Sequence, residues 1–256
     1  MESFLKMNIV TNLDAWQNIR KTLTNKTTGF IPTMGNLHEG HLSLCERSKN
    51  ENEITVVSIF VNPTQFNQLS DFDRYPRTVE QDIDLLNVDY VLLPDPKEMY
   101  PDNYQVQINE TQLSLELEGE YRPGHFTGML TIVLKLLNLA QATRAYFGEK
   151  DYQQLLLVKK MVSALFLSTE IIGCETIRAE DGLALSSRNS QLNSAQREMA
   201  RFFPQLLNST LGITEVSAQL KSLGFKVDYI VEKWQRRLGA VWVGDIRLID
   251  NIELKG

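Results

Sequence analysis

The sequence predicts an α/β protein with a parallel sheet covered by helices on both faces, followed by a smaller C-terminal domain. Short apolar segments typical of strands alternate with helical segments over the first 176 residues, and this alternation indicates crossover units in a parallel sheet. After about Ile177 the sequence becomes turn-rich. We therefore expect two domains, at residues 1–176 and 177–256.

The expected elements of the first domain follow one another in regular order. Strands are expected at the short apolar runs, residues 28–31, 54–61, 89–93, 144–147 and 170–174. Helices are expected at residues 41–49, after Thr78, at 126–140 and at 151–167. Ligands of such sheets bind beyond the carboxyl ends of the strands, where the segment from Pro32 to His38 should emerge.

The expected second domain begins with the turn-rich stretch Glu180–Asn189, whose Ser-Ser-Arg portion has the composition of a loop. A helix is expected to begin near Ser194. Strands are expected at residues 226–231 and 240–249, flanking a helical or looped piece.

Composition restricts the class of protein. With 43% hydrophobic and 23% charged residues, the chain resembles an ordinary globular protein, and no apolar run is long enough to cross a bilayer. The net charge of −6 argues against broad nucleic-acid binding. The start of the chain lacks the pattern of a signal peptide, and two cysteines without paired spacing fit a reducing compartment. A cytoplasmic protein with small-molecule partners, binding neither nucleic acid nor membrane, is expected.

The segment His38-Glu39-Gly40-His41 is the strongest local signal, because it joins an apolar strand to a helix. A helix start offers unpaired N–H groups and the positive end of the helix dipole, and a glycine lets a bulky anion approach the backbone. With two imidazoles sharing one helical face, the pattern predicts a phosphate site. Zinc is the weaker alternative, because the usual His-Glu-x-x-His spacing is four and here it is three.

Other segments carry chemical groups at strand ends. Gln65, after an apolar strand, can both donate and accept, as recognition of a hydroxyl and a carboxylate requires. Lys150 supplies a point charge for phosphate, Asp151 is suited to capping a helix or holding ribose, and Gln154 lies on the same helical face as Asp151. Tyr121–Phe126 either lines a pocket or forms a turn before a core helix.

Six segments in order carry a resemblance to the pantothenate synthetase family, which makes the amide between pantoate and β-alanine. They are Pro32–His41, Phe60–Phe66, Asp73–Thr78, Tyr121–Phe126, Phe147–Gln154 and Leu185–Asn189. The resemblance implies the nucleotidylyltransferase superfamily, a Rossmann-like parallel sheet, a small α+β C-terminal lid domain and a homodimer. It also implies ATP and Mg²⁺, a pantoyl-adenylate, and release of AMP and diphosphate.

The resemblance also implies roles for individual residues. Those expected to act on the phosphates are His38, His41, Lys150, Ser186 and Arg188. Those expected to bind ATP are Met34, Gly35, Asn36, Leu37, His38, Glu39, Gly40, His41, Gly148, Glu149, Lys150, Asp151, Ile177, Leu185, Ser186, Ser187 and Arg188. Gln65 and Gln154 are expected to hold pantoate, and Asp82 to bind magnesium.

Two alternatives and three departures accompany this resemblance. The alternatives are a nucleotidylyltransferase acting on another small acceptor and a non-catalytic nucleotide-binding module. Asn36 stands where the family often has a small residue, and Gln81 stands where an acid is common. Residues 203–227 are short for the family, which bears on the size of the lid.

Overall fold

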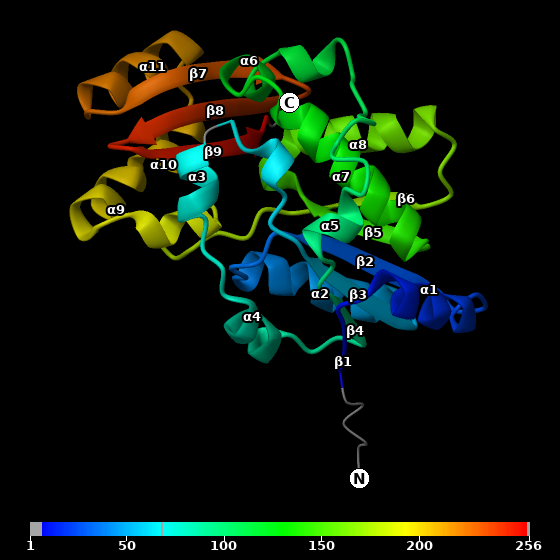
Figure 1. Ribbon diagram of the computed structural model, residues 1–256. Coiled ribbons are helices and arrows are strands. Elements are labelled where there is room, and N and C mark those ends of the chain that lie inside the picture. The colour runs from blue at the N-terminus through cyan, green and yellow to red at the C-terminus, as the bar shows by residue number, and fades with distance from the viewer. Residues whose placement is uncertain (1–6, 68, 255–256) are drawn as a thin grey trace. The chain divides into compact units, whose positions relative to one another are not determined.

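The computed structural model describes residues 7–67 and 69–254, and Figure 1 shows its helices and strands. The chain forms two compact units. The N-terminal unit contains Met1–Leu37, His41–Gly148 and Gln153–Cys174, and the C-terminal unit contains His38–Gly40, Glu149–Tyr152 and Glu175–Gly256. Two short segments and residues 175 and 176, all within the first 176 residues, are thus grouped with the C-terminal unit.

A parallel sheet forms the centre of the N-terminal unit. In the described residues it has six strands in the order β1-β4-β3-β2-β5-β6, and all five strand pairs are parallel. The strands are β1 (Asn8–Val10), β2 (Thr28–Thr33), β3 (Ile54–Ile59), β4 (Tyr90–Leu92), β5 (Arg144–Gly148) and β6 (Glu170–Cys174). The five strands expected from apolar runs are confirmed, and β1 is additional.

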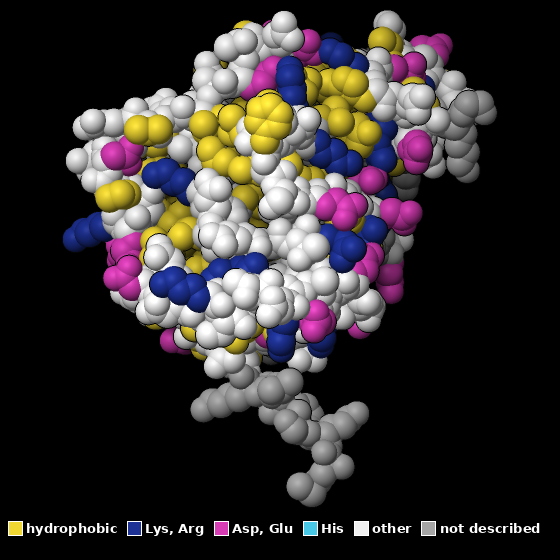
Figure 2. Space-filling view, turned by 90° about the vertical axis from the view of Figure 1, so that its right-hand side faces the viewer, with side chains coloured by type: hydrophobic (Ala, Val, Ile, Leu, Met, Phe, Trp, Pro, Cys, Tyr) yellow, Lys and Arg dark blue, Asp and Glu magenta, His cyan; other side chains and the backbone are white. Residues whose placement is uncertain are grey.

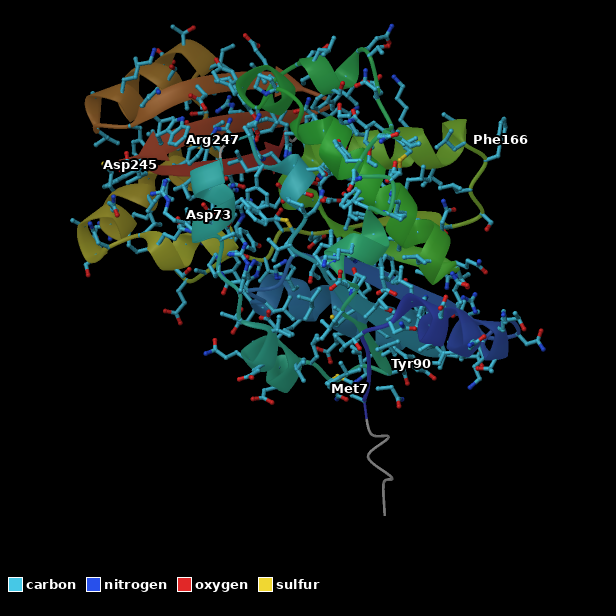
Figure 3. The ribbon with its side chains drawn as sticks, in the orientation of Figure 1. Met7, Asp73, Tyr90, Phe166, Asp245 and Arg247 are labelled. Atoms are coloured by element: carbon cyan, nitrogen blue, oxygen red, sulfur yellow. The ribbon has the colours of Figure 1, made fainter. Side chains whose placement is uncertain are left out.

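Helices connect these strands, as the alternation predicts. They are α1 (Leu13–Thr22), α2 (Glu39–Glu51), α3 (Leu69–Arg74), α4 (Val79–Leu85), α5 (Pro96–Met99), α6 (Glu118–Tyr121), α7 (His125–Ala140) and α8 (Tyr152–Ala164). No described helix is both long enough and apolar enough to cross a membrane. After α8 the side chain of Phe166, labelled in Figure 3, is 94% exposed.

Both faces of the central strands β2 and β3 are buried, as expected for a parallel sheet covered by helices on both sides. Ile31 and Val57 pack with Leu44 of α2 in one core cluster. Side chains alternate between the faces of a strand, so Phe30 and Val56 point to the opposite face, and they are fully buried as well. Helices therefore cover both sides, as a sheet built from crossover connections requires.

The strand order places the candidate site. β2 lies between β3 and β5, so the chain leaves β2 toward one side of the sheet and later returns on the other. In open parallel sheets this switch in direction opens a crevice at the carboxyl ends of the two central strands. The segments after β2, β3 and β5 begin at this edge, and they contain most of the residues predicted to bind ATP and pantoate.

The C-terminal unit contains a three-stranded antiparallel sheet in the order β7-β8-β9. Its strands are β7 (Lys226–Lys233), β8 (Arg236–Val243) and β9 (Ile246–Glu253), and its helices are α9 (Ser194–Ala200), α10 (Phe202–Leu207) and α11 (Ile213–Ser222). Figure 1 shows the helices beside this sheet. Phe203 of α10 and Val216 of α11 are fully buried in a cluster with Val241 of β8.

The expected helical or looped piece between two C-terminal strands is wrong. Only Trp234 and Gln235 separate β7 from β8, and both have positive φ angles of 56° and 57°. Two-residue hairpin turns favour Asn and Gly, which is why this turn has no recognisable sequence signature. The expected single strand at 240–249 contains a second turn, with Gly244 at φ 60°, and so belongs to two strands.

Candidate active site

The segment after β2 turns sharply at Gly35 and Asn36. Their φ angles are 79° and 50°, in the left-handed region that glycine adopts freely and asparagine tolerates best among other residues. The hydroxyl of Thr33 accepts a hydrogen bond from the Gly35 N–H at 3.2 Å. Asn36, which the sequence comparison with the family marks as a departure, therefore fits the backbone of this turn.

The carboxylate of Asp82, in α4, holds the backbone of this turn in place. This carboxylate is 1% exposed and accepts from the N–H of Asn36 at 2.9 Å, the N–H of Leu37 at 2.7 Å and the hydroxyl of Thr78 at 3.2 Å. A Cβ added at Gly35 would lie 2.9 Å from the Oδ2 of Asp82. The Asp82 carboxylate thus occupies the hydrogen-bonding capacity of these two backbone N–H groups, which are therefore not available to an anionic ligand.

These contacts do not fit Asp82 as a direct ligand of Mg²⁺. Magnesium needs accessible oxygens in near-octahedral geometry and keeps several waters. The Asp82 oxygens are buried and already accept three hydrogen bonds. Within residues 7–67 and 69–254, no group of three or more His, Cys, Asp or Glu is placed to hold a metal ion.

Replacing Asp82 with asparagine should raise the KM for ATP by about tenfold or more and leave the half-saturating Mg²⁺ concentration unchanged. The amide offers one acceptor oxygen where the carboxylate offers two, so a buried N–H loses its charge-assisted partner, at a cost of about 1.5–3 kcal/mol. Steady-state rates over a magnesium titration measure both quantities. Asp84→Asn, which changes an exposed carboxylate of the same helix, is the control. A higher magnesium requirement in Asp82→Asn alone would restore the ligand role.

His38 lies immediately before α2 and not within it, because the helix begins at Glu39. The expectation that His38 and His41 share one helical face is therefore wrong, and only His41 lies in the first helical turn. The N–H of Gly40 donates to the Nδ1 of His38 at 3.1 Å. This contact makes Nδ1 the acceptor, so the proton of the neutral ring resides on Nε2, which is then a donor.

His38 also has little tendency to become charged. Burial lowers the pKa of His38 to about 4, with a further lowering by the positive charge of Lys150 and an opposing effect of Asp151. The imidazole is thus neutral at pH 7 and acts as a hydrogen-bond donor through Nε2. Gly40 lets the ring come this close, since a Cβ there would lie 2.9 Å from the His38 Nδ1 and Cε1 atoms.

The low pKa of His38 makes stability depend on pH in a defined window. Between the ordinary pKa of 6.5 and about 4, the unfolded chain binds a proton at this ring and the folded chain does not. The free energy of unfolding should therefore fall as pH falls through this window, by at most about 3 kcal/mol from this residue.

His38→Asn keeps an acceptor for Gly40 and cannot be protonated. The difference in unfolding free energy between the natural chain and this variant should shrink as the pH is lowered from about 7 to about 5. Urea unfolding at several pH values measures this difference. Parallel curves for the two proteins would show that His38 does not titrate in this range.

Gln65 follows β3 in a short 3₁₀ helix, Pro63–Gln65, and its amide orientation is fixed by neighbours. Asn62 Nδ2 donates to the Gln65 Oε1 at 2.9 Å, and Asn62 Oδ1 accepts from the Tyr100 hydroxyl at 2.6 Å. Burial raises the pKa of Tyr100 to about 12, so this hydroxyl keeps its proton. The Gln65 oxygen is thus engaged, which leaves its Nε2 group able to donate to a ligand.

His125 and Gly128 of α7 pack against the backbone of the 3₁₀ helix that carries Gln65. His125 Nδ1 lies 2.8 Å from the Gln65 carbonyl oxygen, and Arg122 Nη1 lies 3.1 Å from His125 Nε2. Because arginine only donates, Nε2 accepts and Nδ1–H donates to the carbonyl. A Cβ at Gly128 would lie 2.2 Å from the Thr64 carbonyl oxygen. Arg122 and His125, weighed from sequence as pocket residues or as a turn, therefore support Gln65.

The two adjacent glutamines of α8 differ in role. Gln153 is 3% exposed and makes three hydrogen bonds, to Glu118 N, Leu113 O and Glu116 O. Gln154 is half-buried and makes no side-chain hydrogen bond to another described residue. Gln153 is thus structural, whereas the amide of Gln154 can bind a ligand.

Lys150 lies in the C-terminal unit, in the 3₁₀ turn Glu149–Asp151. Its Nζ is 3.8 Å from the Asp151 carboxylate. The helix expected at 151–167 extends over Tyr152–Ala164, directly after this turn.

Ile177, a predicted ATP-binding residue, has its carbonyl oxygen engaged, because it accepts a hydrogen bond from the Leu185 N–H at 2.9 Å.

The Ser-Ser-Arg segment is not a loop, because Ser187–Gln191 forms a 3₁₀ helix. Ser186 caps its start by accepting at Oγ from the Arg188 N–H at 3.3 Å. Asn189 donates from Nδ2 to the Ala184 carbonyl at 2.9 Å, which ties this helix to the preceding turn. Ser186 and Arg188 are therefore presented from an ordered segment of the C-terminal unit.

The chain is similar in sequence to known proteins over nearly its whole length. A family model described as pantoate-beta-alanine ligase matches residues 7–253. A pantothenate synthetase of Coxiella burnetii is 53% identical over 247 residues, covering 95% of this chain and 96% of the relative. One of Legionella pneumophila is 51% identical over 249 residues, covering 96% and 99%.

Solved structures with similar sequences also have a similar fold. A pantoate-beta-alanine ligase of Francisella tularensis, complexed with beta-gamma ATP and β-alanine, has a TM-score of 0.93 and 42% identity, covering 96% of this chain and 97% of that chain. A pantothenate synthetase of Thermus thermophilus has a TM-score of 0.89 and 38% identity, covering 98% and 100%.

Proposed function

The chain belongs to the pantoate-beta-alanine ligase family, and we propose that it makes the amide bond of pantothenate through a pantoyl-adenylate. It is an ATP-dependent ligase that joins pantoate to β-alanine. The single structural observation that favours an acidic, hydroxylated substrate is Gln65, whose Nε2 is held as a donor. Neither alternative expected from the sequence gains support from the relatives.

The first chemical step is displacement at phosphorus. An oxygen of the pantoate carboxylate, ionised at neutral pH, attacks the α-phosphorus of ATP, and the bond between this phosphorus and the bridging oxygen of diphosphate breaks. In the second step the neutral amine of β-alanine attacks the acyl carbon, AMP leaves with the bonding electron pair, and the nitrogen releases a proton. No base is needed for the first attack, so positioning and charge neutralisation must supply the rate.

The phosphate contacts are assigned to five side chains. His38 donates from Nε2 as a neutral imidazole, which its low pKa and the Gly40 contact support. His41, in the first turn of α2, donates toward the phosphates as well. Lys150, Ser186 and Arg188 neutralise and bind the leaving diphosphate. These groups act best when they bind more tightly as negative charge moves onto the leaving group.

Other contacts complete the assignment. Gln65 and Gln154 hold pantoate, and Gln65 also faces β-alanine. The N–H of Ile177 contacts adenine, and Gly148, Glu149 and Asp151 lie against ribose and phosphate. The remaining ATP contacts come from Met34 to Leu37, from Glu39 and Gly40, and from Leu185 and Ser187.

Mg²⁺ is proposed to accompany ATP, where it would supply positive charge to the phosphates, and the buried Asp82 carboxylate does not fit as its ligand. Residues 177–256 are proposed as a lid domain, and their grouping into one compact unit supports this. A lid would protect the acyl-adenylate from water.

We also propose a homodimer and a cytoplasmic location. Figure 2 shows hydrophobic side chains on one face of the surface, and Val106 and Leu115 are 69% and 65% exposed. Cys45 and Cys174 are free and buried, which suits a reducing compartment. Light scattering on the purified chain tests the dimer.

The function is tested by measuring AMP and diphosphate release from ATP and Mg²⁺ with pantoate alone, β-alanine alone, and both. Sustained AMP release only with both substrates, with an amide product, is the expected result. No AMP under any combination would overturn the proposal, provided that ATP binds. A burst of diphosphate with pantoate alone is expected for the adenylate.

A further inference from the structure

The turn that carries Lys150 is held by the last strand of the C-terminal sheet. Asn251 of β9 donates from Nδ2 to the Glu149 carbonyl at 2.9 Å and to the Lys150 carbonyl at 3.0 Å. These two carbonyls belong to the peptide groups on either side of the Lys150 Cα atom. One buried amide, 3% exposed, thus fixes both peptide planes that determine where the lysine side chain begins.

Arg236 of β8 contacts this turn, the residue that follows it and Asn251 itself. Its Nη2 lies 2.6 Å from the Glu149 Oε2, and its Nη1 donates to the Asn251 Oδ1 at 2.9 Å. Its guanidinium carbon lies 4.3 Å from the centre of the Tyr152 ring. The Asn251 oxygen is therefore engaged by arginine, which leaves the amide nitrogen to face the two carbonyls.

Asn251 is itself held in place by neighbouring charged groups. The adjacent Asp250, whose side chain is 1% exposed, forms a bidentate pair with Arg178, at 2.7 and 2.9 Å. The Arg178 Nη2 also donates to the Asn251 carbonyl at 3.2 Å, and the Asn251 N–H donates to the Asp250 Oδ1 at 2.7 Å. Backbone and side chain of Asn251 are thus both fixed, so its amide is preorganised before it meets the turn.

We propose that Asn251 and Arg236 are positioning residues for Lys150, acting through the turn Glu149–Tyr152. This inference rests on the proposed role of Lys150 in binding the leaving diphosphate. A lysine is a long, flexible point charge, so its contribution depends on where its Cα is held. The rate of adenylate formation then depends on two side chains of the C-terminal sheet that need not touch ATP.

The test is Asn251→Leu, which keeps the same branched four-atom side-chain shape and cannot donate. Single-turnover diphosphate release should slow by about tenfold or more, the fold-change expected for one lost positioning contact, while the KM for pantoate changes less than about twofold. Glu232→Gln is the matched control, because Glu232 pairs with Arg237 in the same sheet and takes no part in holding the turn. Thermal unfolding checks that each variant is folded.

A double-mutant cycle with Lys150→Ala separates positioning from a general structural effect. If Asn251 acts through Lys150, then Asn251→Leu should cost less than about twofold when Lys150 is already alanine. An equal loss in both backgrounds would overturn the proposal. So would a fall in melting temperature with an unchanged rate.

Arg236→Lys provides an independent variant if Asn251→Leu does not fold. It keeps a positive charge beside Glu149 but loses the planar contact with Tyr152 and the fork to Asn251. A partial loss of rate, absent when Lys150 is alanine, supports the proposal, and an unchanged rate contradicts it. Failure of the underlying assignment is distinct: Lys150→Ala would keep its rate, or the natural chain would release no AMP.

Discussion

Lys150→Ala should slow adenylate formation by about 10²–10³-fold, the range found when an enzyme loses one preorganised transition-state donor. Pantoate and ATP are both anionic, so charge must be neutralised as diphosphate leaves. The backbone of the turn that carries Lys150 is held by two hydrogen bonds from Asn251. Single-turnover diphosphate release measures this step directly.

The matched control is Lys159→Ala, which removes an exposed lysine from α8 without touching the turn. Its rate should equal that of the natural chain, which separates loss of a specific contact from loss of net charge. A decrease of less than about fivefold in Lys150→Ala, far below the range for a transition-state donor, would remove Lys150 from the phosphate contacts.

The second large effect is expected for Gln65→Glu. Glutamate is the same size and still accepts from Asn62, so the turn should keep its structure. The group facing the substrate, however, changes from a donor N–H to a carboxylate. Placing one carboxylate against another costs several kcal/mol, so the KM for pantoate should rise about a hundredfold or more.

ATP affinity should stay within about twofold of the natural value, since the phosphate contacts are assigned to other residues. Calorimetric titration with ATP and with pantoate separates the two. Gln17→Glu adds the same charge at an exposed position of α1 and should change neither. A loss confined to ATP binding would place Gln65 in the nucleotide site instead.

Most of the sheet is predictable from sequence because it is buried on both faces. β3 is buried at all six positions, and four of its six residues are Ile or Val. β1 escapes prediction because it has three residues, two of them exposed. The hairpin between β7 and β8 escapes it because Trp234 and Gln235 are unusual residues for a two-residue turn.

The candidate site is predictable in its chemical groups but not in their supports. His38, Gln65 and Lys150 stand in short motifs that identify phosphate or carboxylate binding. Asn62 stands in the same motif as Gln65, so its position was a usable signal. Asn251 is 101 residues from Lys150 in sequence, and no local pattern links them. Asp82 stands in an acidic stretch that suggests a metal ligand, and the sequence gives no sign that its carboxylate accepts from two backbone amides.

The close contact between Gly40 and the His38 ring links the variation allowed at these two positions. Any side chain at position 40 would occupy the space of the imidazole, because its Cβ would lie 2.9 Å from two ring atoms. In a library that randomises both codons, larger residues at position 40 should survive only where position 38 has lost its ring. Position 40 should therefore change only together with position 38, whereas position 38 can change while Gly40 is kept.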